Sequence, residues 1–123
     1  VRFVGGLLGH WAVWTRAAVQ LLDEIHQATE GEKAIPADWL TRAIEVTDMN
    51  AALFDAANEF RGCVPGVHHV LNQQGLTGDS RCLDTSACLS NGQELELERI
   101  RASYHHLLDD QFVQSHVERW RSS

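Results

Sequence analysis

The chain contains few of the residues that mark several classes of protein. It has two prolines, one lysine, one methionine and three cysteines in 123 residues, while 44% of its residues are hydrophobic. Wholesale disorder, collagen-like repeats and low-complexity sequence are therefore excluded. A chain of this length buries roughly two thirds of its unfolded surface, which is enough for one domain with a real core.

Positive charge is also scarce. Lys and Arg number 10 against 17 Asp and Glu, for a formal net charge of −7, and no stretch gathers the arginines. Because phosphate contacts need clustered positive charge, we expect no nucleic-acid partner. The longest uncharged run, Phe3–Thr15, is broken by glycines and is too short to span a bilayer, so we expect no membrane insertion.

The three cysteines, Cys63, Cys82 and Cys88, are odd in number and have no repeated spacing. This disfavours a disulfide framework and favours a reducing compartment, so we expect a cytoplasmic protein. Cys63 with His68 and His69 supplies zinc-type donors, but at the spacing of no known zinc motif. Cys63 with His68 also lacks the acid and oxyanion donor of a thiol nucleophile. We therefore predict no metal site, no cofactor and no catalytic residue.

The apolar spacing predicts a short extended segment followed by a compact group of about five helices. The opening residues 2–6 read as a short strand that ends in glycines. The Gln74-Gly75-Leu76 tripeptide reads as a Schellman stop, and Ser90 with Gln93 reads as a capping box. The predicted helices run from about Leu7 or His10 to Gly31, from Pro36 to about Gly62, after Pro65 to Gly75, from Ser90 through Leu107, and after Asp109, with a loop over Thr77–Leu89.

Buried faces can be assigned to the predicted helices from the same spacing. The first helix should bury an apolar stripe that includes Trp14, Ala18 and Ile25. The predicted buried face of the second is Trp39 or Leu40, Ala43, Val46, Met49, Leu53, Ala57 and Phe60; that of the fourth is Leu97, Ile100, Tyr104 and Leu107.

The order of segments resembles the C-terminal part of the dihydrodipicolinate synthase and N-acetylneuraminate lyase family. The resemblance rests on the paired glycines Gly5 and Gly6 before a helix, the helix end at residues 53–58, the helix after Pro65 and the stop at Gly75. It implies the C-terminal portion of a TIM (β/α)8 barrel with its helical extension. The chain is too short for a complete barrel of about 250 residues.

The family resemblance implies a class I aldolase or lyase, in which a barrel lysine forms a Schiff base with pyruvate or another 2-oxo acid. Lys33 lies in an acidic turn beside Glu30 and Glu32, which would favour the charged ammonium, so it is not that lysine. The one tyrosine, Tyr104, matches no proton-relay position of the family. Only Gly5 and Gly6 correspond to positions that could border a substrate carboxylate.

We therefore expect residues 1–34 to be the last barrel strand and its helix, and residues 35–123 the helical region, with no true boundary between them. Met49 is the only methionine, so we expect a processed chain or a piece of a longer one. The parent is expected to be a homo-oligomer, and this part of it to be inactive alone, with an exposed apolar patch at Phe3, Val4, Leu7 and Leu8. The alternatives are a free-standing helical interaction module and a small metal-binding or thiol protein.

Overall fold

The structure, a computed structural model, describes residues 2–31 and 34–122. Over these residues it is all α-helical, with six α-helices, two short 3-10 helices and no strand. The predicted mainly helical class is confirmed. The elements are α1 (His10–Val13), α2 (Thr15–Ala28), α3 (Asp38–Phe54), η1 (Ala56–Asn58), α4 (Cys63–Gln73), α5 (Gln93–Ser103), η2 (His105–Leu107) and α6 (Asp110–Arg121).

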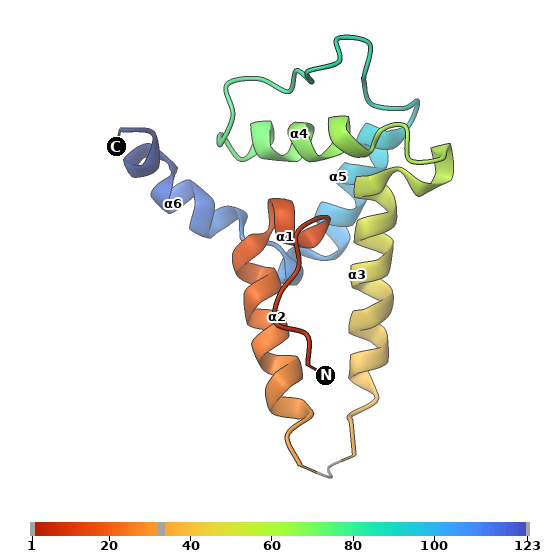
Figure 1. Cartoon of the computed structure of the whole chain (residues 1–123), viewed down its shortest axis with the longest axis vertical. Helices are drawn as coiled ribbons and strands as arrows, with labels where there is room; N and C mark the ends of the chain where they lie inside the picture. The colour runs from red at the N-terminus through yellow and green to blue at the C-terminus, as the bar shows by residue number, and fades with distance from the viewer. Residues whose placement is uncertain (1, 32–33, 123) are drawn as a thin grey trace.

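The helices gather at one end of the molecule. Helices α2 and α3 both extend away from that end in the same direction, while α6 projects to one side (Figure 1). Helix α3 packs chiefly against α5 and α4, and α2 chiefly against α1. The buried core therefore occupies the gathered end; its members are Val13, Trp14, Met49, Ala52, Leu53, Val70, Leu97, Ile100 and Leu107. Helix α2 buries Ala18 alone, which lies outside this cluster.

The predicted N-terminal strand is wrong. Residues 2–8 form an irregular segment that lies in front of α2 (Figure 1). Among the described residues, no backbone group pairs with the backbone of Phe3–Leu8. A strand forms only where a second strand accepts and donates its backbone hydrogen bonds, and the described chain offers none.

The first predicted helix is interrupted at Trp14. This residue has φ −127° and ψ 53°, outside the helical region, and separates α1 from α2. The interruption turns the indole of Trp14 into the core, where it is fully buried. Periodicity places Trp14 on the buried face but gives no sign of the break, because the apolar spacing continues across it.

The second predicted helix ends earlier than expected. Asp55 takes a left-handed conformation with φ 60° and stops α3, and η1 follows. Met49 and Leu53 are buried as predicted. Of the alternatives Trp39 and Leu40, Trp39 is half-buried, whereas Leu40 is exposed on the outer side of α3. Phe60, predicted to be buried, is exposed because it lies beyond the end of α3, also at positive φ.

The later elements agree closely with the predictions made from the sequence, with two exceptions. The Schellman stop is confirmed: Gly75 has φ 75° and the Leu76 N–H donates to the Leu71 carbonyl at 3.0 Å. Helix α5, however, begins at Gln93, after Gly92 and not after Ser90. The Asp109 carboxylate does not cap α6; it accepts the Arg16 N–H at 2.8 Å, at the start of α2.

Candidate functional site

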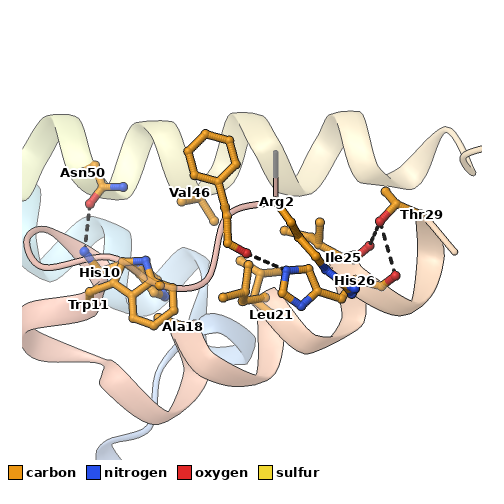
Figure 2. Close-up of a pocket in the computed structure, with 13 residues that line it drawn as sticks. Arg2, His10, Trp11, Ala18, Leu21, Ile25, His26, Thr29, Val46 and Asn50 are labelled. Carbon is orange, nitrogen blue, oxygen red and sulfur yellow. Dashed lines mark hydrogen bonds between the residues drawn. The ribbon is translucent and has the colours of Figure 1, made fainter.

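An apolar groove lies between α2 and α3, with a volume of about 460 Å³; two other cavities of the described chain have similar volumes of about 470 and 500 Å³. Leu21, Leu22 and Ile25 line it from α2 and Val46 lines it from α3, while the N-terminal segment crosses its mouth (Figure 2). No carboxylate is among its lining residues in the described chain, and its titratable members are Arg2, His10 and His26. Such a groove can bury apolar surface, but it holds no paired acid and base.

Two polar contacts hold the N-terminal segment over the groove. His26 Nε2 donates to the Phe3 carbonyl at 2.8 Å, and the Arg2 guanidinium lies 3.9 Å from the Glu30 carboxylate. The apolar side chains of the segment are not covered: Phe3, Val4, Leu7 and Leu8 are between 67% and 90% exposed. The predicted apolar patch at these four residues is therefore present.

His10 closes the inner end of the groove as a structural link. Its Nε2 donates to the Leu107 carbonyl at 2.8 Å, and its backbone N–H donates to Asn50 Oδ1 at 2.9 Å. Burial lowers the pKa of His10, and the hydrogen bond to Leu107 opposes this shift without cancelling it. The imidazole is therefore neutral near pH 7, and its hydrogen bond to Leu107 joins α1 to η2. Because the ring is buried, it is not available to a substrate.

The two glycines assigned to the substrate carboxylate have different surroundings. A Cβ on Gly5 would meet nothing within 4 Å, whereas a Cβ on Gly6 would lie 2.5 Å from the Trp11 ring. Gly6 is thus required for the packing of Trp11. Gly5 borders the groove, and neither glycine lies against a group that could perform chemistry.

Gly9 has the most demanding conformation in this segment. Its φ is 63°, and an added Cβ would lie 2.2 Å from Asn50 Oδ1, the atom that binds the His10 N–H. We expect Gly9→Ala to lower the free energy of unfolding by about 2 kcal/mol or more. Chemical denaturation would measure the loss.

Two other glycines serve as controls for Gly9→Ala. Gly31 has φ 83° in open space, so Gly31→Ala reports backbone strain alone, while Gly78→Ala meets neither strain nor contact. Equal losses in all three variants would contradict the role given to the contact with Asn50.

The cysteine and histidine candidates are not brought together. Burial raises the pKa of the Cys63 thiol, which disfavours the reactive thiolate. His68 Nδ1 pairs with the Arg81 carbonyl at 2.8 Å, and His69 Nε2 lies 3.9 Å from Glu94. No group of three or more His, Cys, Asp or Glu side chains in the described part of the chain could hold a metal ion. Lys33 lies outside the described residues.

A buried polar cluster at the end of α3 was missed by the sequence analysis. The Gln93 amide donates to the Gly62 carbonyl at 3.0 Å and to the Ala52 carbonyl at 3.3 Å, and its oxygen accepts the Ser90 N–H at 3.1 Å. Asp55 accepts the Gly62 N–H at 2.9 Å and the Ser90 hydroxyl. The cluster joins α5 to the end of α3, so its role is to hold the gathered helices together.

Burial would raise the pKa of Asp55, but its hydrogen bonds act in the other direction. The Asn58 amide donates to one carboxylate oxygen at 2.7 Å, and Ser90 and Gly62 donate to the other. Together they outweigh burial and hold the pKa of Asp55 below its ordinary value. The pair Ser90 and Gln93, interpreted from the sequence as a capping box, belongs to this cluster.

Comparison with protein families, with curated proteins and with solved structures finds no match to this chain. In the part of the chain that is described, no helix has both the length and the apolar character that crossing a bilayer requires.

Proposed function

We propose that this chain is the C-terminal helical portion of a Schiff-base-forming lyase or aldolase that acts on pyruvate or another 2-oxo acid. The chain is catalytically incomplete alone, and its work in the parent is structural. It supports the last strand of the barrel, covers the barrel from outside and contributes to contacts between subunits. The family resemblance of the sequence supplies the reaction class.

One observation carries this proposal: the apolar segment at Phe3, Val4, Leu7 and Leu8 is exposed, and within the described chain its backbone makes no hydrogen bond to another backbone group. Monomeric proteins rarely expose a contiguous run of large apolar side chains. A segment with apolar side chains, whose backbone pairs with no other backbone, is suited to pairing with a neighbouring strand. The missing neighbour is the preceding part of the barrel.

The chemistry explains why the chain is inactive alone. In Schiff-base formation an unprotonated lysine amine attacks the ketone carbon of the 2-oxo acid, and water leaves as the imine forms. The amine must therefore have a depressed pKa, through burial or a neighbouring cation. The single lysine of this chain, Lys33, stands between Glu32 and Ala34 and two residues after Gly31, in an acidic stretch. The reactive amine belongs to the parent.

Borohydride trapping with pyruvate tests this assignment. Borohydride reduces an enzyme-bound imine to a stable secondary amine, which intact-mass spectrometry detects as an added pyruvate-derived group. We expect no adduct on this chain and a stoichiometric adduct on the parent protein encoded by the complete gene. A stoichiometric adduct on Lys33 would overturn the proposal.

The genomic sequence upstream of Val1 provides a second, independent test of the proposed barrel. We expect alternating strands and helices there, with a lysine on one strand, as a barrel requires. An upstream region that codes for no such pattern would leave a free-standing helical interaction module as the better description.

A further inference from the structure

Beyond the proposed function, the groove between α2 and α3 has the form of a small-molecule site. Its volume of about 460 Å³ lies within the range of about 300–1,000 Å³ that ligand pockets occupy. Figure 2 shows Trp11 at the inner end and Arg2 with His26 at the outer end, while Leu21 and Val46 lie between them. An elongated molecule with an apolar body and a polar end matches this arrangement.

The apolar side chains of α2 set the length of the ligand's apolar part. Four of them line the groove over about two turns, or about 10 Å of helix axis. They are Ala18, Leu21, Leu22 and Ile25, and Val46 lines the groove from α3. An unbranched acyl chain laid along these side chains removes apolar surface from water, and each buried CH₂ group should tighten binding about fourfold.

Charge at the mouth of the groove selects the polar end of the ligand. The whole chain carries a net charge of −7, yet no carboxylate lines the groove within the described residues. The permanently charged lining group is the Arg2 guanidinium, which lies 3.9 Å from Glu30, beyond hydrogen-bond length. Because both side chains are exposed, a ligand carboxylate can replace Glu30 and accept two parallel N–H bonds from the guanidinium. An anionic head is therefore favoured over a cationic one.

The N-terminal segment forms a strap across the groove. At the inner end the His10 N–H binds Asn50 Oδ1 at 2.9 Å, and at the outer end His26 binds the Phe3 carbonyl at 2.8 Å. Between these two contacts, no backbone group of the described chain pairs with the backbone of Phe3–Leu8. Breaking the contact with His26 therefore lets the strap lift to admit a ligand and close again with Arg2 over the ligand's head.

We propose that the groove binds a medium-chain fatty acid, with the acyl chain between α2 and α3 and the carboxylate on Arg2. The groove and its strap are formed within this chain, so the inference does not rest on the proposed function. Because the strap is also the proposed barrel strand, the barrel and the fatty acid would compete for it in the parent.

Isothermal titration calorimetry with decanoate, below its micelle-forming concentration, tests the proposal. We expect one saturable site per chain, and octanoate should bind about fifteenfold more weakly because it lacks two CH₂ groups. Decyltrimethylammonium has the same tail with a positive head and should bind about tenfold more weakly than decanoate. The net charge of −7 acting alone would give the opposite order. Tighter binding of the cation, or no saturable binding of decanoate, would overturn the proposal.

Two aspartate variants of α2 locate the site. Ile25→Asp places a negative charge in the groove and should weaken decanoate binding roughly thirtyfold or more. The matched control is Val19→Asp, on the same helix at similar exposure but outside the lining, which should leave binding unchanged. Circular dichroism checks that both variants are equally helical. Equal binding by the two variants would overturn the site.

Arg2→Gln tests the assignment of the head. It should weaken decanoate binding about tenfold and leave the binding of decanol unchanged, because decanol carries no charge for Arg2 to bind. An equal loss for both ligands would overturn the role of Arg2. The proposed function is tested separately: trapping on Lys33 would sink that function alone, whereas failure of decanoate to bind would sink the fatty-acid site alone.

Discussion

Gln93→Leu is expected to lower the free energy of unfolding by about 3 kcal/mol, since it removes the hydrogen bonds that join a buried side chain of α5 to the backbone around the end of α3. The Ser90 N–H and the Leu53 carbonyl lose the side-chain partner that Gln93 provides, while the carbonyls of Ala52 and Gly62 keep the N–H groups of Asp55 and Gly66. Leucine nearly matches glutamine in volume, so the effect measures hydrogen bonding more than packing. Proteins of this size are stable by only about 5–15 kcal/mol, which makes this a large fraction of the total.

Urea denaturation with circular dichroism measures the effect of Gln93→Leu. The matched control is Gln114→Leu, on an exposed position of α6, which should change the unfolding free energy by less than about 0.5 kcal/mol. A Gln93→Leu variant as stable as the parent chain would show that the cluster does not hold α5 to α3.

Asp55→Asn is expected to destabilise the chain by about 2 kcal/mol at neutral pH. One carboxylate oxygen becomes an amide that faces hydrogen-bond donors, from Asn58 on one side or from Gly62 and Ser90 on the other. Asparagine tolerates the left-handed conformation that Asp55 adopts, so the backbone is not additionally strained. The loss therefore reports the polar contacts.

The same variant has a defined pH dependence. Because the folded-state pKa of Asp55 lies below its unfolded value, the carboxylate stabilises the fold above the unfolded pKa of about 3.9. That contribution is lost as pH falls through the folded pKa. The difference in unfolding free energy between the parent chain and Asp55→Asn should therefore be constant near neutrality and shrink in acid.

Taking the difference between the two proteins cancels the other titrating groups, including Asp48, whose pKa is also lowered, and Asp109, whose pKa is raised by burial. Asp79→Asn, at an exposed carboxylate bonded to Arg81, is the control and should have little effect. A difference that grows in acid would contradict the role of Asp55.

Local sequence signals identified the features that depend on local chemistry. The helical class, the buried Met49 and Leu53, and the Gly75 stop follow from apolar spacing and from glycine's access to positive φ. The break at Trp14 was missed and the choice between Trp39 and Leu40 stayed open, because both depend on which neighbours are present. Periodicity marks an apolar face, but it does not say what covers that face.

The polar cluster escaped detection for a related reason. Ser90 and Gln93 have the spacing of a capping box, and half of that pattern forms, since the Ser90 N–H does bind the Gln93 side chain. The other half is replaced by Asp55, which is 35 residues away in sequence. A signal was present in Gly62 and Gly66, where any side chain would collide with Gln93. Two glycines one helical turn apart indicated a close approach.

Because the core lies at one end of the molecule, the free energy of local unfolding differs between its two ends. The far halves of α2 and α3, beyond Ala18 and Met49, contribute no fully buried residue to the core, and only Val46 packs against it from there. Fraying of these halves breaks few buried contacts, so it needs much less free energy than global unfolding. Backbone amides there should exchange with deuterated solvent well before those of α5. The gathered end can therefore stay folded while these halves of the two helices open.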